Sequence, residues 1–285
     1  MSATGESATL PVAALVAYDG SDYFGFQVQS GVPTIQGALE EALSTFTTLQ
    51  GRVTGAGRTD TGVHARGQVV GATVVWKHTL ADLQRAWNAH LPSAISVRSL
   101  AQGTQGWHPR FSALSRTYRY TVVEWGGGRT APLHAPLAER FAHFERSALD
   151  SVAMAAAAQT LVGRRDFAAF GQPPQGENSV RTVSRAEWDV VPQPATLEAK
   201  QDRTLLFTIT ADAFLQHMVR RIVGSLLEVG RGRWSVERFA DVLASCELRN
   251  SAPPAVPNGL VLEAVEYPSQ WGINFWNSND QGSLR

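Results

Sequence analysis

The sequence is poor in cysteine, in lysine and in long hydrophobic runs. Among 285 residues only Cys246 is a cysteine, which excludes an internal disulfide and any metal site built from several cysteines. No apolar run approaches the roughly 20 residues that cross a bilayer. The polar N-terminus lacks the basic residues of a secretory signal. With 44% hydrophobic and 18% charged residues, we expect a globular protein of the cytoplasm.

Because lysine is nearly absent, arginine carries the positive charge: 23 of the 25 basic residues are arginine. The net charge of zero is unevenly distributed, with −5 over residues 1–50, +7 over residues 51–130 and −2 over the rest. A GC-rich genome also favours arginine, but codon bias does not explain this clustering. Arginine suits phosphates and bases because its planar group donates two hydrogen bonds and stacks on rings. We therefore expect arginines of the middle block to contact phosphates, among them Arg66, Arg110 and Arg116.

Hydrophobic periodicity predicts two successive β-α-β-β-α-β units. The first has expected strands over 12–18, 52–54, 69–76 and 94–100 and helices over 35–46 and 79–91, with Thr34 as an N-cap. The second has expected strands over 117–124, 181–191, 204–211 and 260–267 and helices over 144–162, 214–229 and 236–245. We therefore expect an α+β fold of two ferredoxin-like halves that form a continuous mixed sheet, with a central cleft between them.

This pattern gives four predicted parts of the chain. They are a flexible N-terminus over 1–9, an N-terminal half over 10–110, a C-terminal half over 111–268 and a tail over 269–285.

The most unusual segment is the glycine-rich stretch from Gly55 to Ala65, which the first half carries. Three glycines within eight residues indicate a tight loop where the backbone approaches something closely. Arg58 and Asp60 are the only charged residues in it, and both could reach a cleft. An ordinary turn with a local ion pair stays open as the alternative interpretation.

Other catalytic chemistries find little support. The triplet Asp60-Thr61-Gly62 matches aspartic proteases, but those enzymes need two such aspartates and this chain has no second triplet. The seven histidines are scattered without metal-ligand spacing, and no Gly-x-Ser-x-Gly motif marks a nucleophilic serine. By elimination, a lone carboxylate in a glycine-rich loop is the best catalytic candidate.

Two further segments combine aromatic and basic residues. On a strand, Arg116, Tyr118 and Tyr120 share one face, an arrangement with which sheets stack and hold unpaired RNA bases. An ordinary strand with aromatic core contacts is the alternative. In the helix expected over 214–229, one of Arg220 and Arg221 is expected to point inward, where it needs a carboxylate partner.

These segments together resemble the tRNA pseudouridine synthase A family, bacterial enzymes that isomerise uridine in the anticodon stem-loop of tRNA. The resemblance covers nearly the whole chain, through Tyr18-Asp19-Gly20, Gly25-Phe26-Gln27, Ala56-Gly57-Arg58-Thr59-Asp60, 214–230 and 259–267. It implies the pseudouridine synthase fold, a cleft that binds RNA, and isomerisation at tRNA positions 38, 39 and 40 by a homodimer without metal or other cofactor.

The resemblance also implies roles for individual residues. Asp60 would be the catalytic nucleophile or base, and Tyr118 the ring that packs on the target uracil. Arg220 would pair with Asp60 in the cleft, and Arg58 would contact RNA and help to hold a displaced base. The sequence departs from the family pattern at three positions, which bear on substrate breadth but remove no charged group: Phe26, Thr61 and Val261, in place of Trp, Ala and Tyr.

Two alternatives from other functional classes stay open, namely a non-catalytic RNA-binding module and an RNA glycosidase on the same fold. Binding alone does not need the set of Asp60, Tyr118 and Arg220. A glycosidase also uses carboxylates to break a glycosidic bond, but it would release free uracil.

Overall fold

Five α-helices and ten β-strands lie in the residues that the computed structural model describes: 9–124, 136, 138–173, 176, 178–192, 203–273 and 275. The chain is therefore an α+β protein. It divides into two compact units, one of Met1–Leu114 with Leu262–Arg285 and the other of Ser115–Val261. Most of the predicted N-terminal segment and residues 274 and 276–285 of the predicted tail lie outside the described residues. None of the described helices is long and apolar enough to cross a membrane.

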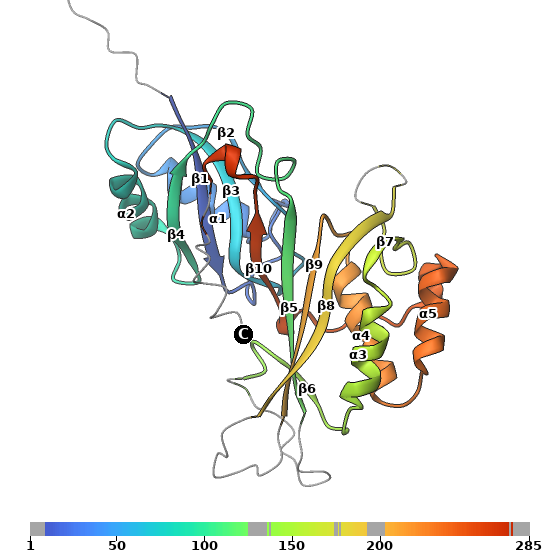
Figure 1. The fold of residues 1–285 in the computed structure, drawn as a ribbon. Coiled ribbons are helices and arrows are strands. Elements are labelled where there is room, and N and C mark those ends of the chain that lie inside the picture. The colour runs from blue at the N-terminus through green and yellow to red at the C-terminus, as the bar shows by residue number, and fades with distance from the viewer. Residues whose placement is uncertain are drawn as a thin grey trace, which may run out of the picture. The chain divides into compact units, whose positions relative to one another are not determined.

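The first unit is a sheet with two helices (Figure 1). Its strands are β1 (Thr9–Tyr18), β2 (Leu49–Gly55), β3 (His64–Val75), β4 (Ile95–Gln102) and β10 (Leu260–Glu266). The strand order is β4-β1-β3-β10, with β2 also paired to β3. The pairs β1–β4, β1–β3 and β2–β3 are antiparallel. Helix α1 (Ile35–Ser44) packs on β2 and α2 (Leu80–His90) on β4, and because the two helices touch they cover the same face.

Local sequence signals start both helices of this unit. Thr34 caps α1 by accepting a hydrogen bond from the Gly37 N–H, which confirms the predicted N-cap. Thr79 and Asp82 form a capping box at the start of α2. The fully buried Trp87 donates from its indole nitrogen to the Leu39 carbonyl at 3.2 Å, which ties α2 to α1. The amphipathic pattern and the caps therefore agree, as expected for well-defined helices.

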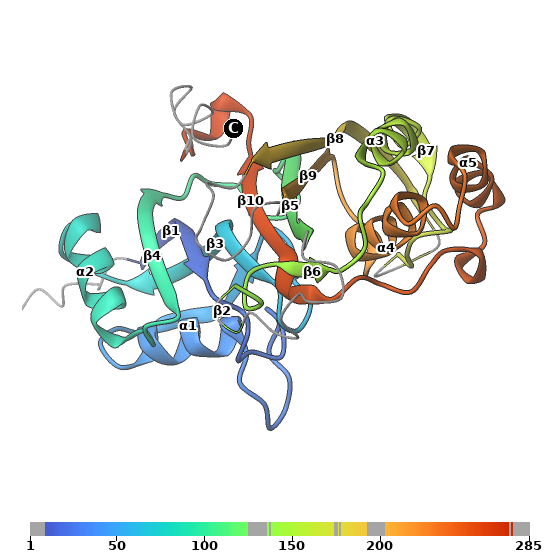
Figure 2. The same cartoon turned by 90° about the horizontal axis from the view of Figure 1, so that it is seen from below.

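The second unit is also a sheet with helices. Its strands are β5 (Ser115–Glu124), β6 (His143–Glu145), β7 (Gly163–Asp166), β8 (Val180–Pro192) and β9 (Arg203–Ala211). The strand order is β5-β9-β8-β7 with antiparallel pairs, and β6 pairs parallel with β5. Helices α3 (Ser151–Gln159), α4 (Met218–Gly230) and α5 (Val236–Ser245) pack on one another and gather on one side of β8 (Figure 2).

Two helices begin later than the periodicity predicts. Helix α3 begins at Ser151 rather than at residue 144, because His143–Glu145 pair with β5 and Asp150 caps the helix by accepting from the Ala153 N–H. Helix α4 begins at Met218 rather than at residue 214. The residue before it, His217, has φ 62°, a left-handed conformation that interrupts helical backbone. Helix α3 ends at Gln159 rather than at residue 162, and Gly163 opens β7, a strand that the pattern did not predict.

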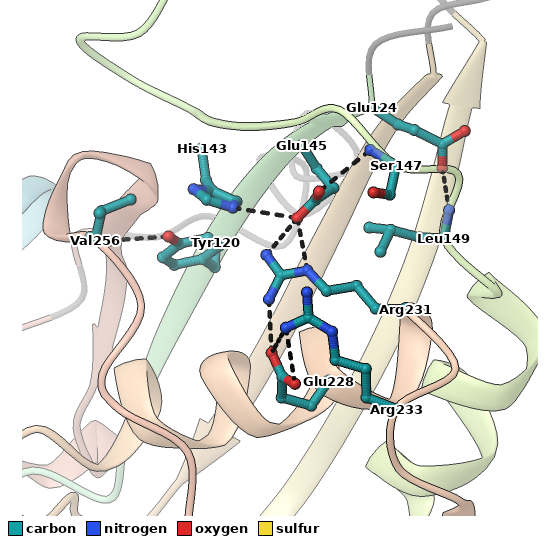
Figure 3. Close-up of polar contacts among 10 residues, drawn as sticks. All are labelled: Tyr120, Glu124, His143, Glu145, Ser147, Leu149, Glu228, Arg231, Arg233 and Val256. Atoms are coloured by element: carbon teal, nitrogen blue, oxygen red, sulfur yellow. Dashed lines mark hydrogen bonds and ion pairs between the residues drawn. The ribbon is translucent and has the colours of Figure 1, made fainter. Parts of the chain in front are cut away.

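A buried ion-pair network ties β6 to the end of α4 (Figure 3). Glu145 is 7% exposed and accepts from Arg231 through both Nε, at 3.0 Å, and Nη2. Arg231 also donates to Glu228 at 2.8 Å, and Ser147 donates its N–H to Glu145 at 3.2 Å. Burial acts to raise the pKa of Glu145, but His143, Arg231 and the Ser147 N–H outweigh it and lower the pKa to about 2. The network therefore stabilises the charged carboxylate.

Replacing Glu145 by glutamine is expected to lower the free energy of unfolding by about 2–3 kcal/mol at pH 7, because a buried charge pair loses one partner. The folded-state pKa lies below the ordinary value of 4.5, so the stabilisation is complete above that pH and is lost as the pH falls towards 2. Urea unfolding at pH 7 and pH 3 measures both effects. The matched control is Glu187→Gln, which breaks an exposed pair with Arg185 and should cost at most about 0.5 kcal/mol. Equal losses in the two variants would contradict the prediction.

Candidate active site

Asp60 lies in the loop of residues 56–63 that joins β2 to β3 in the first unit. Its side chain is half-buried, whereas that of Arg58, two residues earlier, is exposed. The two charged residues of the loop are thus in different surroundings. A half-buried carboxylate can meet a substrate group while much of it is withdrawn from water, and an exposed arginine is placed for a more distant contact.

The residue before Asp60 is held by buried hydrogen bonds. Thr59 is 6% exposed, and its Oγ1 lies 2.8 Å from the hydroxyl oxygen of Tyr18 at the end of β1. Gln68 on β3 donates from Nε2 to the Gly57 carbonyl at 2.9 Å and to the Tyr18 hydroxyl at 3.5 Å. Burial raises the pKa of Tyr18 to about 12, although the hydrogen bonds with Thr59 and Gln68 act to lower it. The hydroxyl therefore stays protonated at neutral pH and anchors the loop.

The segment of residues 20–26 holds the same loop through its backbone. Three hydrogen bonds join them: Phe26 N–H to Thr59 O at 3.0 Å, Gly62 N–H to Tyr23 O at 3.3 Å, and Gly20 N–H to His64 Nδ1 at 3.1 Å. These bonds lie on both sides of Asp60 in the sequence. The loop is therefore fixed before and after the carboxylate, as a preorganised catalytic group requires.

Two glycines permit this close approach. A Cβ atom on Gly20 would lie 2.0 Å from the Val63 carbonyl oxygen, and one on Gly25 would lie 2.8 Å from the Thr59 carbonyl oxygen. Gly25 also has φ 86°, which side chains disfavour. The motifs Tyr18-Asp19-Gly20 and Gly25-Phe26-Gln27, to which the sequence alone assigned no role, thus position the Asp60 loop.

Gly25→Ala is expected to reduce the catalytic rate at least tenfold, because the added methyl group must displace the Thr59 backbone beside Asp60. Gly31→Ala is the matched control: Gly31 has φ 76°, so it shares the backbone strain, but a Cβ there meets nothing within 4 Å. Both variants should lose about 1–2 kcal/mol of stability from that strain. The rate constant at saturating substrate separates them, and equal rates in the two variants would refute the positioning role.

Tyr118 lies on β5 in the second unit. Arg116, Tyr118 and Tyr120 are buried while the residues between them are half-buried, which confirms the predicted alternation. The Tyr118 ring is 8% exposed and meets the Phe214 ring edge-to-face, with centroids 5.1 Å apart. This contact holds the ring in one orientation. Arg116 donates to the Asp212 carbonyl at 2.7 Å and is 7% exposed, and its predicted contact with phosphate stays a prediction.

Arg220 and Arg221 occupy the first turn of α4, and both bind the segment of residues 251–256. Arg220 donates from Nε to the Ala255 carbonyl at 2.7 Å, and the Ala255 N–H donates back to the Arg220 carbonyl at 2.9 Å. Arg221 donates from Nη1 to Ser251 Oγ at 3.1 Å. The segment of residues 251–256 therefore orients both arginines.

Residues of α4 and β5 allow this segment to approach closely. A Cβ atom on Gly224 would lie 2.2 Å from the Pro253 carbonyl oxygen, and the fully buried Ser225 accepts the Ala252 N–H at 3.1 Å. Tyr120 donates its hydroxyl to the Val256 carbonyl at 2.8 Å. Burial raises the pKa of Tyr120 well above its usual value, and the charge of Arg220 acts in the opposite direction. Arg220 thus lies near the buried face of β5.

The four predicted site residues fall into two pairs. Arg58 and Asp60 belong to the first unit, and Tyr118 and Arg220 to the second. The predicted pairing of Arg220 with Asp60 joins the two units and stays a prediction. The described residues contain no group of three or more His, Cys, Asp or Glu side chains placed to hold a metal ion.

Comparison with known proteins gives one family. The family model described as tRNA pseudouridine synthase matches residues 14–112 and 157–268. The tRNA pseudouridine synthase A of Chloroflexus aurantiacus is 42% identical over 257 residues, which cover 90% of this chain and 88% of the relative. The tRNA pseudouridine synthase A of Neisseria gonorrhoeae is 39% identical over 264 residues, which cover 90% of this chain and 92% of the relative. That of a Roseiflexus species is 38% identical over 257 residues, which cover 90% of each chain. The chain therefore belongs to the tRNA pseudouridine synthase family.

Proposed function

We propose that this chain isomerises uridine to pseudouridine in tRNA, at positions 38, 39 and 40 of the anticodon stem-loop, with Asp60 as the catalytic nucleophile or base. The observation that carries the proposal is the half-buried Asp60, fixed on both sides in a loop of a chain that matches this family over most of its length. An ordinary turn with a local ion pair needs no such double anchoring.

The chemistry fits a single carboxylate. The reaction breaks the N1–C1′ glycosidic bond, turns the uracil and forms a bond from C1′ to C5, while the hydrogen on C5 leaves as a proton and N1 gains one. The product is an isomer of the substrate, so neither an oxidant nor a phosphoryl donor takes part. Asp60 acts in its ionised form, either by forming a covalent adduct or by removing a proton.

The other three residues have roles in holding the substrate. Tyr118, oriented by Phe214, packs on the flipped uracil and offsets the few kcal/mol that flipping costs. Arg220, held by Ala255, supplies a positive charge to Asp60. The exposed Arg58 contacts RNA and helps to hold the displaced base.

The proposal includes the finer architecture. The antiparallel strand order β4-β1-β3-β2 of the first unit supports a ferredoxin-like half. The order β5-β9-β8 of the second unit supports a related half, with the boundary near residues 110–115 and an RNA-binding cleft in one continuous sheet. The enzyme acts as a homodimer in the cytoplasm, where tRNA is modified, and requires no cofactor.

A single assay tests the function against its alternatives. Purified protein is incubated with unmodified tRNA, and the RNA is digested to nucleosides and separated by mass spectrometry and chromatography. Pseudouridine supports the proposal, free uracil indicates a glycosidase, and unchanged uridine with bound tRNA indicates a non-catalytic RNA-binding module. Sequencing of the modified positions then tests the range 38, 39 and 40.

A further inference from the structure

The connection from β4 to β5, residues 103–114, presents an aromatic side chain to solvent. Phe111 is 77% exposed. Single exposed apolar side chains are common on protein surfaces, so exposure alone indicates nothing about function. The neighbours of Phe111 and the rigidity of its loop are what distinguish it.

A ring and a cation lie beside Phe111. The His108 ring is inclined by 31° to it, with centroids 4.4 Å apart. The guanidinium carbon of Arg110 lies 5.6 Å from the Phe111 ring centroid, within cation–π distance. Aromatic rings combined with arginine are the groups on which proteins stack unpaired bases.

The loop that carries Phe111 is held by its own hydrogen bonds. His108 Nδ1 accepts the N–H groups of Arg110 at 3.0 Å and Phe111 at 3.3 Å. The Ser112 hydroxyl accepts the His108 N–H at 3.0 Å, and the Ser112 N–H donates to the His108 carbonyl at 3.0 Å. Phe111 is therefore presented in a defined position, which lowers the entropic cost of binding.

Outer contacts fix the loop to the sheet of the first unit. Tyr267 donates its hydroxyl to the Pro109 carbonyl at 2.6 Å. Pro109 and Trp107 pack against Gly71 on β3, which has no side chain. A Cβ atom at Gly71 would lie 3.2 Å from a Pro109 atom and 3.1 Å from a Trp107 atom. His64 opens β3 directly after the Asp60 loop, and Gly71 lies seven residues further along the strand. At about 3.3 Å per residue, Gly71 is therefore roughly 23 Å from the end of that loop.

We infer that Phe111, supported by His108 and Arg110, is a stacking platform for an exposed base of the RNA substrate, other than the uridine that reacts. This inference rests on the proposed function. The separation along β3 places the platform several nucleotides from the reacting base. Phe111 belongs to the sequence block 51–130, whose charge balance is +7, and the guanidinium of Arg110 beside the ring supplies a positive charge to the phosphates of that strand.

Equilibrium binding of tRNA by three variants tests the inference. Phe111→Ala should weaken binding about tenfold, which is about 1.4 kcal/mol and within the range for one stacked base, without changing the salt dependence, because no charge is lost. Phe111→Leu keeps the apolar bulk but loses the aromatic face, and should weaken binding similarly. Phe111→Trp should bind at least as tightly as wild type. The melting temperatures should stay unchanged because the side chain is exposed.

Leu114→Ala is the matched control, since Leu114 is 58% exposed in the same connection but carries no ring. It should bind tRNA like wild type. Unchanged binding by Phe111→Ala, or an equal loss in Leu114→Ala, would overturn the inference. Dissociation of a homodimer in both variants, seen by sedimentation, would overturn it in favour of a contact with a second copy. The wild-type nucleoside assay is read separately: absence of pseudouridine there refutes the proposed function, whatever the variants bind.

Discussion

Asp60→Asn is expected to reduce pseudouridine formation to less than a few per cent of wild type while the protein still folds and binds tRNA. Asparagine keeps the shape of the side chain but can neither attack as an anion nor accept a proton. The anchors of the loop are made by neighbouring residues, chiefly Thr59, Gly62 and their partners, so its conformation should persist. Loss of a negative charge near phosphates should leave tRNA binding unchanged or tighter. Single-turnover pseudouridine formation and the dissociation constant for tRNA measure the two effects.

The matched control is Asp241→Asn on α5, where an exposed aspartate loses the same charge far from the Asp60 loop in sequence. It should retain wild-type turnover. Activity of Asp60→Asn above a few per cent would exclude Asp60 as the essential nucleophile or base. A large fall in the melting temperature would instead show that Asp60 is structural, and Asp60→Ala would then be examined for the same fall.

The sequence predicted most elements because their signals are local. Apolar spacing and an N-cap at Thr34 depend only on nearby residues, and helix α1 begins where they indicate. The errors arose where a long-range contact decides the structure. Residues 144 and 145 lie within an alanine-rich helical pattern, yet pairing with β5 and the Glu145–Arg231 ion pair place them in a strand. Tertiary contacts outweigh helix propensity there.

The candidate site shows the same division between local and distant information. Asp60 was identifiable because glycines and charges are concentrated in one short stretch. The hydrogen bond between Tyr18 and Thr59 joins residues 41 apart, and the bond from Arg220 to Ala255 joins residues 35 apart. No periodicity in a single sequence indicates such contacts. The residues that hold a functional group are therefore harder to predict than the group itself.

The position of β10 follows the same principle. Its apolar pattern predicted a strand over 260–267, and the strand spans Leu260–Glu266. Its neighbour β3 lies almost 200 residues earlier in the chain, so residues 262–266 belong to the first unit although they follow the second in sequence. Hydrophobicity predicts that a strand forms, but only the observed strand order identifies the strand beside which it lies.

Arg220→Met is expected to lower activity most at acidic pH. If Arg220 faces Asp60 as we propose, its loss leaves the carboxylate without a neighbouring positive charge, and the ionised form becomes less favourable. The active fraction of the enzyme then falls as the pH decreases, so the acidic limb of the activity–pH profile should move to higher pH. Turnover at pH 8 should be affected much less. Rates of pseudouridine formation between pH 5 and 9 measure the shift.

The next residue supplies a matched control. Arg221 lies on the same turn of α4 and also binds the segment of residues 251–256, but through Ser251 and Ala252 rather than Ala255. Arg221→Met therefore removes the same charge and loosens the same segment without removing the proposed partner of Asp60. It should leave the position of the acidic limb unchanged. If both variants move the limb equally, the segment rather than the charge of Arg220 is responsible. If Arg220→Met only reduces the salt dependence of tRNA binding, by about one unit of slope, Arg220 is a phosphate contact and the proposed ion pair is wrong.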